Sequence, residues 1–191
     1  MNRNVWRLLA ISVVAVGLLA ACGGDETPSR APSTAVPPVP AFVGTGAMAV
    51  DAVSGGLVDA SRVVTGSDPF DVDIDIVSVD PGYQGYQYKL QWDPSILAYN
   101  DQKHLMPVEL TFCADPVFMG ASDVYAGCAR AGGDTTFVGP LNTVTMHCIG
   151  AGVSPLHLKT MTEDPDFGTT VIGDMGILVK TALTDASVTC Q

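Results

Sequence analysis

Three aspartates alternate with apolar residues in the segment Phe70–Val77: Asp71, Asp73 and Asp75. Alternation with a period of two is typical of a half-buried strand, so the three carboxylates should share one face, about 7 Å apart. Like charges on one face repel each other unless a cation or a basic neighbour relieves them. A calcium ion needs about six to eight converging oxygens, and one straight strand does not supply them. We therefore predict a solvated polar face without a metal and, as its functional alternative, a surface for a basic partner.

Aromatic residues crowd the following segment, and exposed flat rings of this kind stack on sugar rings in carbohydrate-binding proteins. Within this segment, one set of alternating residues is apolar: Tyr86, Tyr88, Leu90 and Trp92. Because the aliphatic Leu90 shares this face, we predict that the whole face builds the core and does not bind sugar. Two further tyrosines are expected to remain partly exposed and are the candidate sugar-stacking residues: Tyr83 and Tyr99.

The polar residues of the same segment occupy the opposite face: Gln87, Lys89 and Gln91. The alternation predicts that this face points outward. Together with the three aspartates, these residues form the candidate partner-binding face.

Patterns that indicate catalysis are missing from the sequence. It has no Gly-x-Ser-x-Gly, no His-Glu-x-x-His and no phosphate-binding glycine loop. Its three histidines, His104, His147 and His157, are separated from one another by 43 and 10 residues and form no catalytic motif. None of its glutamates has a setting recognisable for glycoside hydrolysis. We predict a protein that is not an enzyme and needs no cofactor.

The composition indicates a folded, turn-rich and acidic chain. Of its 191 residues, 20 are acidic and 9 are basic, which gives a net charge of −11. Such a surface repels nucleic acid, so a nucleic-acid partner is excluded. The hydrophobic fraction of 47% is more than a disordered chain carries, and 20 glycines with 13 prolines argue against a helical protein. The length fits one domain.

Residues 1–21 have the order of a secretory signal peptide. Arg3 and Arg7 precede the apolar run Leu8–Gly17, and small residues then lead to Cys22. The apolar run is shorter than the roughly 20 residues that a membrane-spanning helix needs.

The sequence around the presumed cleavage site, Leu19-Ala20-Ala21-Cys22, resembles the lipobox of bacterial lipoproteins. That resemblance implies cleavage before Cys22 and a lipid on its sulfur; the alternative is an ordinary cleavage site beside a buried thiol. We expect a protein of the cell envelope, outside the cytoplasm, which the lipid alone holds to the membrane. The proline-rich residues 22–41 then form an extended tether.

From residue 42 to residue 191 the hydrophobic period is near two, which predicts an all-β domain with no convincing helix. About nine or ten short strands are expected, which is typical of a single β-sandwich or barrel. The expected strands are Ala47–Val53, Phe70–Val77, Tyr86–Trp92, Val108–Ala114, Val124–Arg130, Thr135–Val138, Leu141–Ile149, Leu156–Thr160, Gly176–Lys180 and Ala186–Cys190.

Four cysteines lie in this domain: Cys113, Cys128, Cys148 and Cys190. An even number in an exported chain favours disulfides, and no Cys-x-x-Cys or Cys-x-His spacing favours a zinc site. Four cysteines allow three pairings, and the sequence alone does not choose among them. We favour Cys113 with Cys128, which closes a local connection, and Cys148 with Cys190, which ties the last strand to an interior one.

Residues 42–191 resemble a cohesin-type domain, a β-sandwich related to cellulose-binding carbohydrate modules. The most specific part is residues 85–97, where a strand is followed by Trp92-Asp93-Pro94 and then Leu97, in the place of the family's Tyr-Asp-Pro and leucine. Gly66 before the alternating strand Phe70–Ile74 and the strands at 141–149 and 156–158 add to the match.

The resemblance implies a nine-stranded jelly-roll sandwich with a binding activity. The partner would be a dockerin-like or other exported protein, or in relatives a polysaccharide. The resemblance also implies that the strand carrying Gln87 belongs to the sheet that meets the partner. The chain departs from the family in its two expected disulfides, its lipobox, its single copy and its long connection Ser54–Ser67. These departures weaken the expectation of dockerin binding more than they weaken the expectation of the fold.

Overall fold

The computed structural model describes residues 44–106 and 111–191. The expected signal peptide, Cys22, the tether at 22–41 and the first part of the expected strand Val108–Ala114 lie outside these residues. None of the described helices is long and apolar enough to cross a membrane.

The described residues form an all-β domain, as predicted, with thirteen strands and one short 3-10 helix, η2 (Asp174–Gly176). The strands are β1 (Thr45–Asp51), β2 (Ser61–Val64), β3 (Phe70–Asp80), β4 (Gly85–Gln91), β5 (Leu97–His104), β6 (Thr111–Cys113), β7 (Val117–Phe118), β8 (Asp123–Arg130), β9 (Gly139–Cys148), β10 (Gly152–Leu158), β11 (Thr170–Ile172), β12 (Leu178–Thr184) and β13 (Ala186–Cys190).

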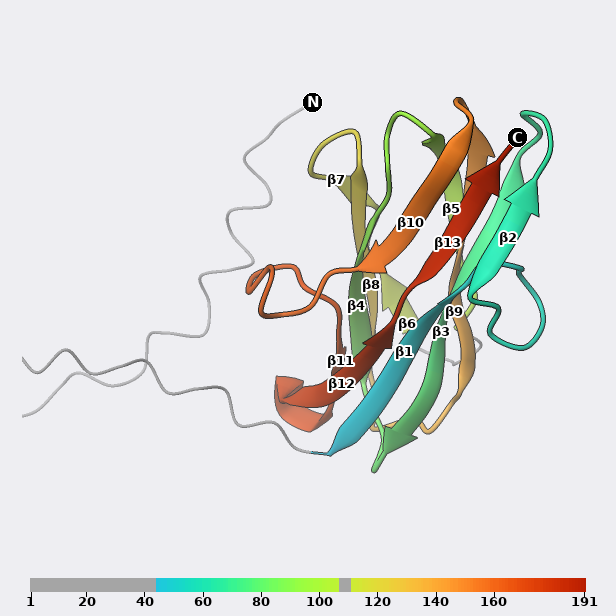
Figure 1. Ribbon diagram of the computed structural model, residues 1–191. Helices are drawn as coiled ribbons and strands as arrows, with labels where there is room; N and C mark the ends of the chain where they lie inside the picture. Colours follow the sequence, from blue (N-terminus) through green and yellow to red (C-terminus); the bar gives the residue numbers. More distant parts are fainter. Residues whose placement is uncertain (1–43, 107–110) are drawn as a thin grey trace, which may run out of the picture. The chain divides into compact units, whose positions relative to one another are not determined.

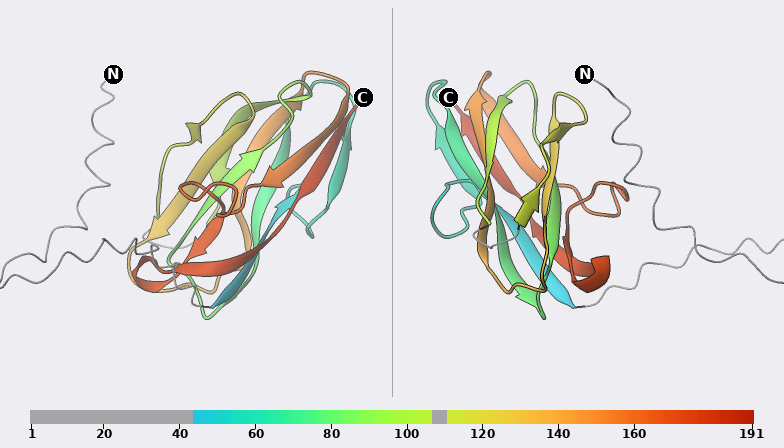
Figure 2. Two further views of the ribbon diagram at one scale, coloured as in Figure 1. Left: turned by 60° about the vertical axis from the view of Figure 1, so that its left-hand side comes forward. Right: turned by 180° about the vertical axis from the view of Figure 1, so that it is seen from behind.

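Two layers of strands enclose the core (Figures 1 and 2). One layer has the order β12-β1-β3-β9-β5. In the other layer, β4 pairs with β8 along one edge and with β10 and β11 along the other, and β13 and β2 extend it beyond β10. Because β12 pairs with both β1 and β11, it joins the two layers on one side. The predicted β-sandwich is confirmed.

The core is built from alternate residues of facing strands. Val72, Ile74 and Ile76 of β3 are at most 1% exposed, and Tyr86 and Leu90 of β4 are buried equally deeply. The predicted inward face of β4 is therefore confirmed, including Trp92 at 4% exposure. Burial of such side chains is the main favourable contribution to folding.

Both predicted disulfides are present. Cys113–Cys128 joins directly opposed residues of β6 and β8, and Cys148–Cys190 joins β9 to β13. The second bridge connects the two layers.

Several short or polar strands were not expected from the sequence. β2, β5, β7 and β11 have no strong alternation of apolar and polar residues, and their pairing with longer neighbours defines them. Conversely, the expected strand Thr135–Val138 was wrong: Thr135 makes one isolated bridge to Tyr83, and the continuous strand begins at Gly139.

Candidate binding surface

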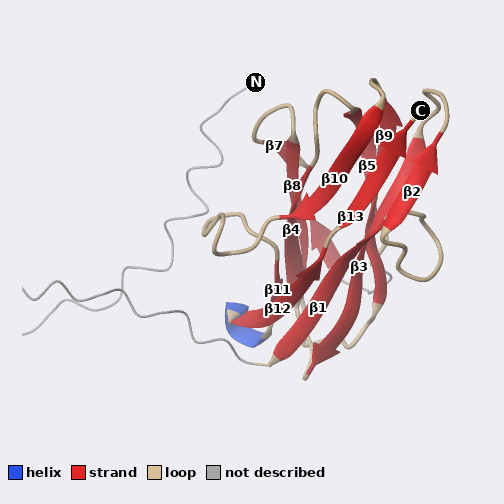
Figure 3. Ribbon diagram, viewed as in Figure 1, coloured by secondary structure: helices blue, strands red, loops and turns tan. Residues whose placement is uncertain are grey.

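The outer face of β4 is covered in part by a loop of the protein itself. Gln87 and Gln91 are half-buried there, but Lys89 is only 6% exposed, so its predicted outward exposure is wrong. The loop at 159–169, between β10 and β11, lies against this face (Figure 3). β10 and β11 both pair with the same edge of β4, so the loop is an excursion between two segments of one sheet edge.

Lys89 fixes this loop by electrostatic contacts. Its Nζ lies 2.7 Å from Oδ2 of Asp164 in the loop and 3.6 Å from Oδ2 of Asp123 on β8. The hydrogen bond to Asp164 raises the pKa of Lys89 more than burial lowers it, and the same bond lowers the pKa of Asp164. The ammonium and the carboxylate therefore both stay charged at neutral pH and tie the loop to the sheet.

Gln87 provides a second attachment beside Lys89. Its Nε2 donates to the carbonyl of Gly168 at 2.8 Å, and its Oε1 accepts from the Tyr125 hydroxyl at 3.2 Å. A Cβ at Gly168 would lie 2.5 Å from the Thr160 carbonyl oxygen, so the close approach of the two loop ends requires glycine here. Gln87 thus links the loop to β8 across the outer face of β4.

His157 holds the base of the same loop. Its Nδ1 lies 2.6 Å from Asp185 Oδ2 and its Nε2 lies 2.9 Å from Glu163 Oε1. Burial lowers the pKa of His157, but the bonds to Asp185 and Glu163 outweigh it and raise the pKa above 6.5. Hydrogen bonds from Thr160 and then His157 lower the pKa of Glu163 to about 2. The base of the loop is therefore tied to β10 and to Asp185 between β12 and β13, and these contacts give His157 a structural role.

Beside this loop, exposed and half-buried apolar side chains lie on the outer face of β6, β7 and β8, directly after β7 and on the loop itself. We call this set the aromatic surface, and it consists of Phe112, Val117, Met119, Tyr125 and Phe167. Phe112 is 66% exposed, and Val117, Met119 and Phe167 are each between 37% and 39% exposed. The rings of Tyr125 and Phe167 meet edge to face with centroids 5.1 Å apart, which joins the loop to the strands.

A shallow hollow of about 210 Å³ lies within the aromatic surface. Gly127, which lines the hollow, is directly opposite Gln87 in the β4–β8 ladder. A Cβ at Gly127 would lie 2.6 Å from the Tyr86 carbonyl oxygen, so the close approach of the two strands requires glycine here. The lining residues are Tyr86, Gln87, Phe112, Ala114, Tyr125, Gly127, Cys128, Ala129 and Ile172. The hollow is smaller than the roughly 300–1,000 Å³ of small-molecule pockets, so its shape suits one protruding side chain of a larger ligand.

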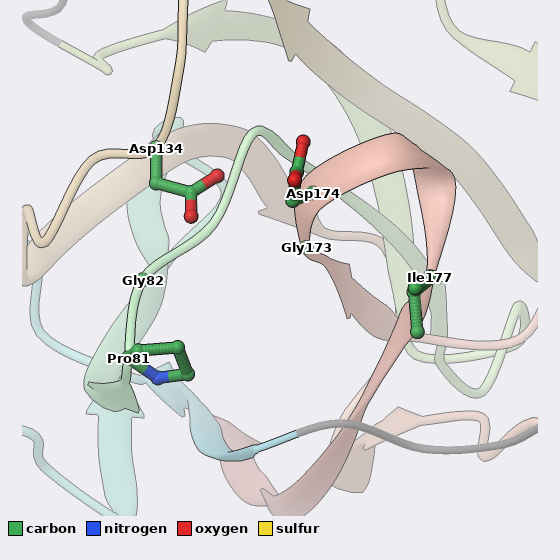
Figure 4. A pocket seen from close by; sticks show the side chains of 6 residues that line it. All are labelled: Pro81, Gly82, Asp134, Gly173, Asp174 and Ile177. Carbon is green, nitrogen blue, oxygen red and sulfur yellow. The ribbon is translucent and has the colours of Figure 1, made fainter.

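A second hollow lies at one end of the domain, beside η2. Asp134 and Asp174 stand at its rim in Figure 4, and the Gln84 amide donates to Asp174 Oδ1 at 3.0 Å. Its volume is about 70 Å³, too small for a sugar ring.

The two candidate sugar-stacking tyrosines differ in position. Tyr83 is fully buried, so its expected exposure is wrong: its backbone pairs with Thr135 and its ring lies in the core. Tyr99 is half-buried, and its ring meets Phe118 edge to face at 4.8 Å. Burial, and then the charge of Asp101, raise the pKa of the Tyr99 hydroxyl.

The aspartates of β3 are not a uniformly solvated face. Asp71 is exposed and accepts a hydrogen bond from Thr145 at 2.6 Å. Asp73 and Asp75, however, are only 2% and 6% exposed, because the connection between β1 and β2 covers them. The predicted partner-binding face is also divided: β3 and β4 belong to different layers, so their outward side chains lie on opposite sides of the sandwich.

His104 lies close to cysteine sulfur: its Nδ1 is 3.2 Å from Cys128 Sγ. Atoms of His104, Cys113 and Cys128 lie within 4.8 Å of one another. The two sulfurs form a disulfide, however, and thiolates are the zinc ligands, so this set does not fit a metal. Burial lowers the pKa of His104 and favours the neutral imidazole, which contacts Asn142 and the Tyr86 hydroxyl.

The aromatic surface was not predicted from the sequence. The usable signal was the expected strand Val124–Arg130, in which Tyr125 takes an outward position that is usually polar. Phe112 likewise precedes a disulfide cysteine and lies on the other side of its strand. Phe167 had no such signal, because only the folded loop places it beside Tyr125.

Solved structures, but no protein family and no curated sequence, resemble this protein. No protein-family model matches the sequence, and no curated protein matches it. Among solved structures, the cohesin module of a family 33 glycoside hydrolase from Clostridium perfringens has a TM-score of 0.60 and 13% identity, covering 78% of this chain and 98% of that module.

Two further cohesins have the same architecture. A non-cellulosomal cohesin from the archaeon Archaeoglobus fulgidus has a TM-score of 0.57 and 15% identity, covering 77% of this chain and 91% of its own. A type I cohesin of Clostridium thermocellum, solved in a cohesin–dockerin complex, has a TM-score of 0.56 and 12% identity, covering 77% and 99%. The fold of this protein is therefore that of a cohesin-type β-sandwich, as the pattern of residues 85–97 indicated.

Proposed function

We propose that the protein is a non-catalytic module that binds an exported protein partner through the aromatic surface. The observation that carries this proposal is the exposure of Phe112, Met119 and Phe167 on one outer face of the sandwich, where Phe112 also lines a hollow. Aromatic residues and methionine are enriched at the centres of protein interfaces, and contiguous exposed apolar groups mark such sites. Lys89 and Gln87 hold the loop in place beforehand, which reduces the entropy lost on binding.

The structural relatives support a protein partner. Cohesins of Clostridium thermocellum and Acetivibrio cellulolyticus with this fold were solved in complex with dockerins. A dockerin-like protein is therefore the first partner to test.

Polysaccharide binding is the alternative function. Since Tyr83 is buried, Tyr99 is the remaining candidate for sugar stacking, and its ring already contacts Phe118. The geometry supports this alternative less well than it supports a protein interface.

The proposed anchor is a lipid on Cys22, which would hold the module to the membrane outside the cytoplasm. Mass spectrometry of the mature N-terminus tests this directly. An acyl mass on Cys22 is expected, and an unmodified N-terminus at another residue would contradict the anchor without bearing on the binding surface.

The binding proposal is tested with surface variants of the full chain. Phe112→Ser and Phe167→Ser each remove one ring from the aromatic surface, and Val153→Ser, at a position 59% exposed on β10, is the matched control. Secreted proteins captured by the wild type are identified, purified and titrated by calorimetry, with type I dockerins as a second panel.

We expect each aromatic variant to weaken binding about tenfold or more, as interface hot spots do, and Val153→Ser to bind like the wild type. Binding that all three variants retain would place the interface elsewhere. Saturable binding on a glycan array that Tyr99→Ala abolishes, with no protein partner, would replace the proposal by the polysaccharide alternative.

A further inference from the structure

A hollow of about 180 Å³ lies on the outer face of β1 and β3. Gly55 and Gly56 line it from the connection between β1 and β2, whose course Figure 1 shows. The hollow is on the opposite layer from the aromatic surface. The lining residues are Asp51, Gly55, Gly56, Asp73, Asp75 and Pro140. Three of these six residues are acidic and none is basic, so the lining carries an uncompensated negative charge.

The β1–β3 ladder brings the three carboxylates together. Asp51 is directly opposite Asp73, and Asp75 is opposite Ala49, two residues from Asp51 along β1. Asp51 is 1% exposed, Asp73 is 2% exposed and Asp75 is 6% exposed. Burial of three carboxylates is costly unless hydrogen bonds or a cation satisfy them.

Hydrogen bonds satisfy Asp73 and one oxygen of Asp51. Asp73 accepts from the Thr143 hydroxyl at 2.6 Å, from the Ser54 hydroxyl at 2.8 Å and from the Gly55 amide at 3.1 Å. Oδ1 of Asp51 accepts from the amides of Val53 and Asp59 at 3.0 and 2.9 Å. These bonds hold the connection between β1 and β2 in place over the hollow.

Two other carboxylate oxygens have no donor. Oδ2 of Asp51 and Oδ1 of Asp75 are buried without a hydrogen-bond partner, and both residues line the hollow. Among the described residues, no basic side chain forms an ion pair with either of them. Buried polar atoms are nearly always satisfied in native proteins, so this pair points to a ligand that accepts their lone pairs.

The pKa of Asp75 agrees with the lack of a hydrogen-bond donor at its Oδ1. Burial, followed by the charges of Asp73 and Asp51, raises its pKa to about 7. A bound cation would offset both the desolvation and the repulsion.

We propose that this hollow is a calcium site, in which Asp51 and Asp75 coordinate the ion directly and Asp73 positions the connection between β1 and β2 through Ser54 and Gly55. Calcium fits because the polar side chains at the hollow offer oxygen only, whereas zinc favours nitrogen and sulfur ligands. β3 alone does not supply enough ligands for calcium. Asp51 on β1 and the connection between β1 and β2 add the further groups that surround the hollow. With two direct carboxylates, the dissociation constant is expected to be about 10⁻⁴–10⁻³ M.

The test is calorimetric titration of calcium into the full chain after treatment with a chelator, together with thermal melting. Asp75→Asn and Asp51→Asn each remove one coordinating charge at nearly constant shape. Asp71→Asn is the matched control, because Asp71 lies on the same strand and face but is exposed and outside the hollow. The test is independent of the partner proposal, since no partner is present.

We expect saturable binding of one calcium ion and a melting temperature that rises with calcium. Each hollow variant should weaken calcium binding at least tenfold, and Asp71→Asn should leave it within twofold. With the chelator present, Asp75→Asn should melt at or above the wild type, because repulsion is relieved. Absence of saturable binding up to about 10 mM calcium, ten times the weakest constant expected, would overturn the site. Equal binding by Asp75→Asn, Asp51→Asn and Asp71→Asn would also overturn it.

Discussion

The Tyr86 hydroxyl on β4 donates to the carbonyl of Leu141 on β9 at 3.0 Å, across the interior between the two layers. Tyr88 makes a parallel contact, from its hydroxyl to Gln102 on β5, also at 3.0 Å. Burial raises the pKa of both phenols, so both remain neutral donors. The two tyrosines fill the core and also fix how one layer sits on the other.

Removal of the Tyr86 hydroxyl should destabilise the protein modestly. The Leu141 carbonyl also accepts from the Leu105 amide, so Tyr86→Phe deprives it of one of two donors. We expect a loss of about 0.5–1.5 kcal/mol in the free energy of unfolding, measured by denaturant titration. Tyr125→Phe is the control: its half-buried hydroxyl can bond to water, so a smaller loss is expected. An equal loss in both variants would contradict a special role for the buried contact.

Neutralising Lys89 should release the loop at 159–169. In Lys89→Met, Asp164 and the buried Asp123 lose their cation. We expect a lower melting temperature and amide hydrogen exchange in the loop that is about tenfold faster or more. Lys103→Met, at an exposed position of β5, is the charge-matched control and should change neither. Unchanged exchange in Lys89→Met would show that the contacts of Gln87 and His157 suffice to hold the loop.

The contacts of His157 predict that stability falls as the solution becomes alkaline. Its pKa in the folded protein is above the unfolded value of 6.5, so the folded state binds the proton more tightly. The stabilisation is fully present below about pH 6.5 and is lost as the pH rises through the folded pKa.

Thermal melting from pH 5 to pH 9 measures this contribution, and His157→Gln is the comparison. We expect the fall in melting temperature between about pH 6.5 and pH 9 to be smaller in His157→Gln than in the wild type, because the variant has no imidazole to deprotonate. Parallel curves for the two proteins would exclude the predicted linkage.

Reduction of the disulfides should lower stability without abolishing the fold. In the chain-entropy relation, a separation of 15 residues for Cys113–Cys128 corresponds to about 3 kcal/mol, and 42 residues for Cys148–Cys190 to about 4 kcal/mol. The apolar core of a domain of this size is sufficient for folding without them.

Calorimetry with and without reductant should therefore show a cooperative transition at a lower temperature. Cys113 is exposed whereas Cys148 and Cys190 are buried, so the first bridge should be reduced first. Loss of all cooperative unfolding on reduction would contradict this expectation.

Local alternation predicted the core well and the outer faces poorly. The inward positions of β4 follow from its sequence, because burial of apolar side chains fixes which face points inward. The outward exposure of Lys89 could not be judged from the same pattern, since a loop about 75 positions later in the sequence covers it. Asp73 and Asp75 were misjudged for the same reason: the β1–β2 connection covers them, and only the β1–β3 register places Asp51 beside them.

The parallel pairing of β1 with β12 and of β2 with β13 has a kinetic consequence. Thr45 pairs with Lys180, and Ser61 pairs with Ser187, so the first two strands obtain these neighbours only from the last two. Contacts between residues so distant in the sequence form slowly, because a long loop must close before the contacts can stabilise it. A ribosome that still holds β12 and β13 therefore keeps the sandwich incomplete, and this domain can fold fully only after β13 has emerged.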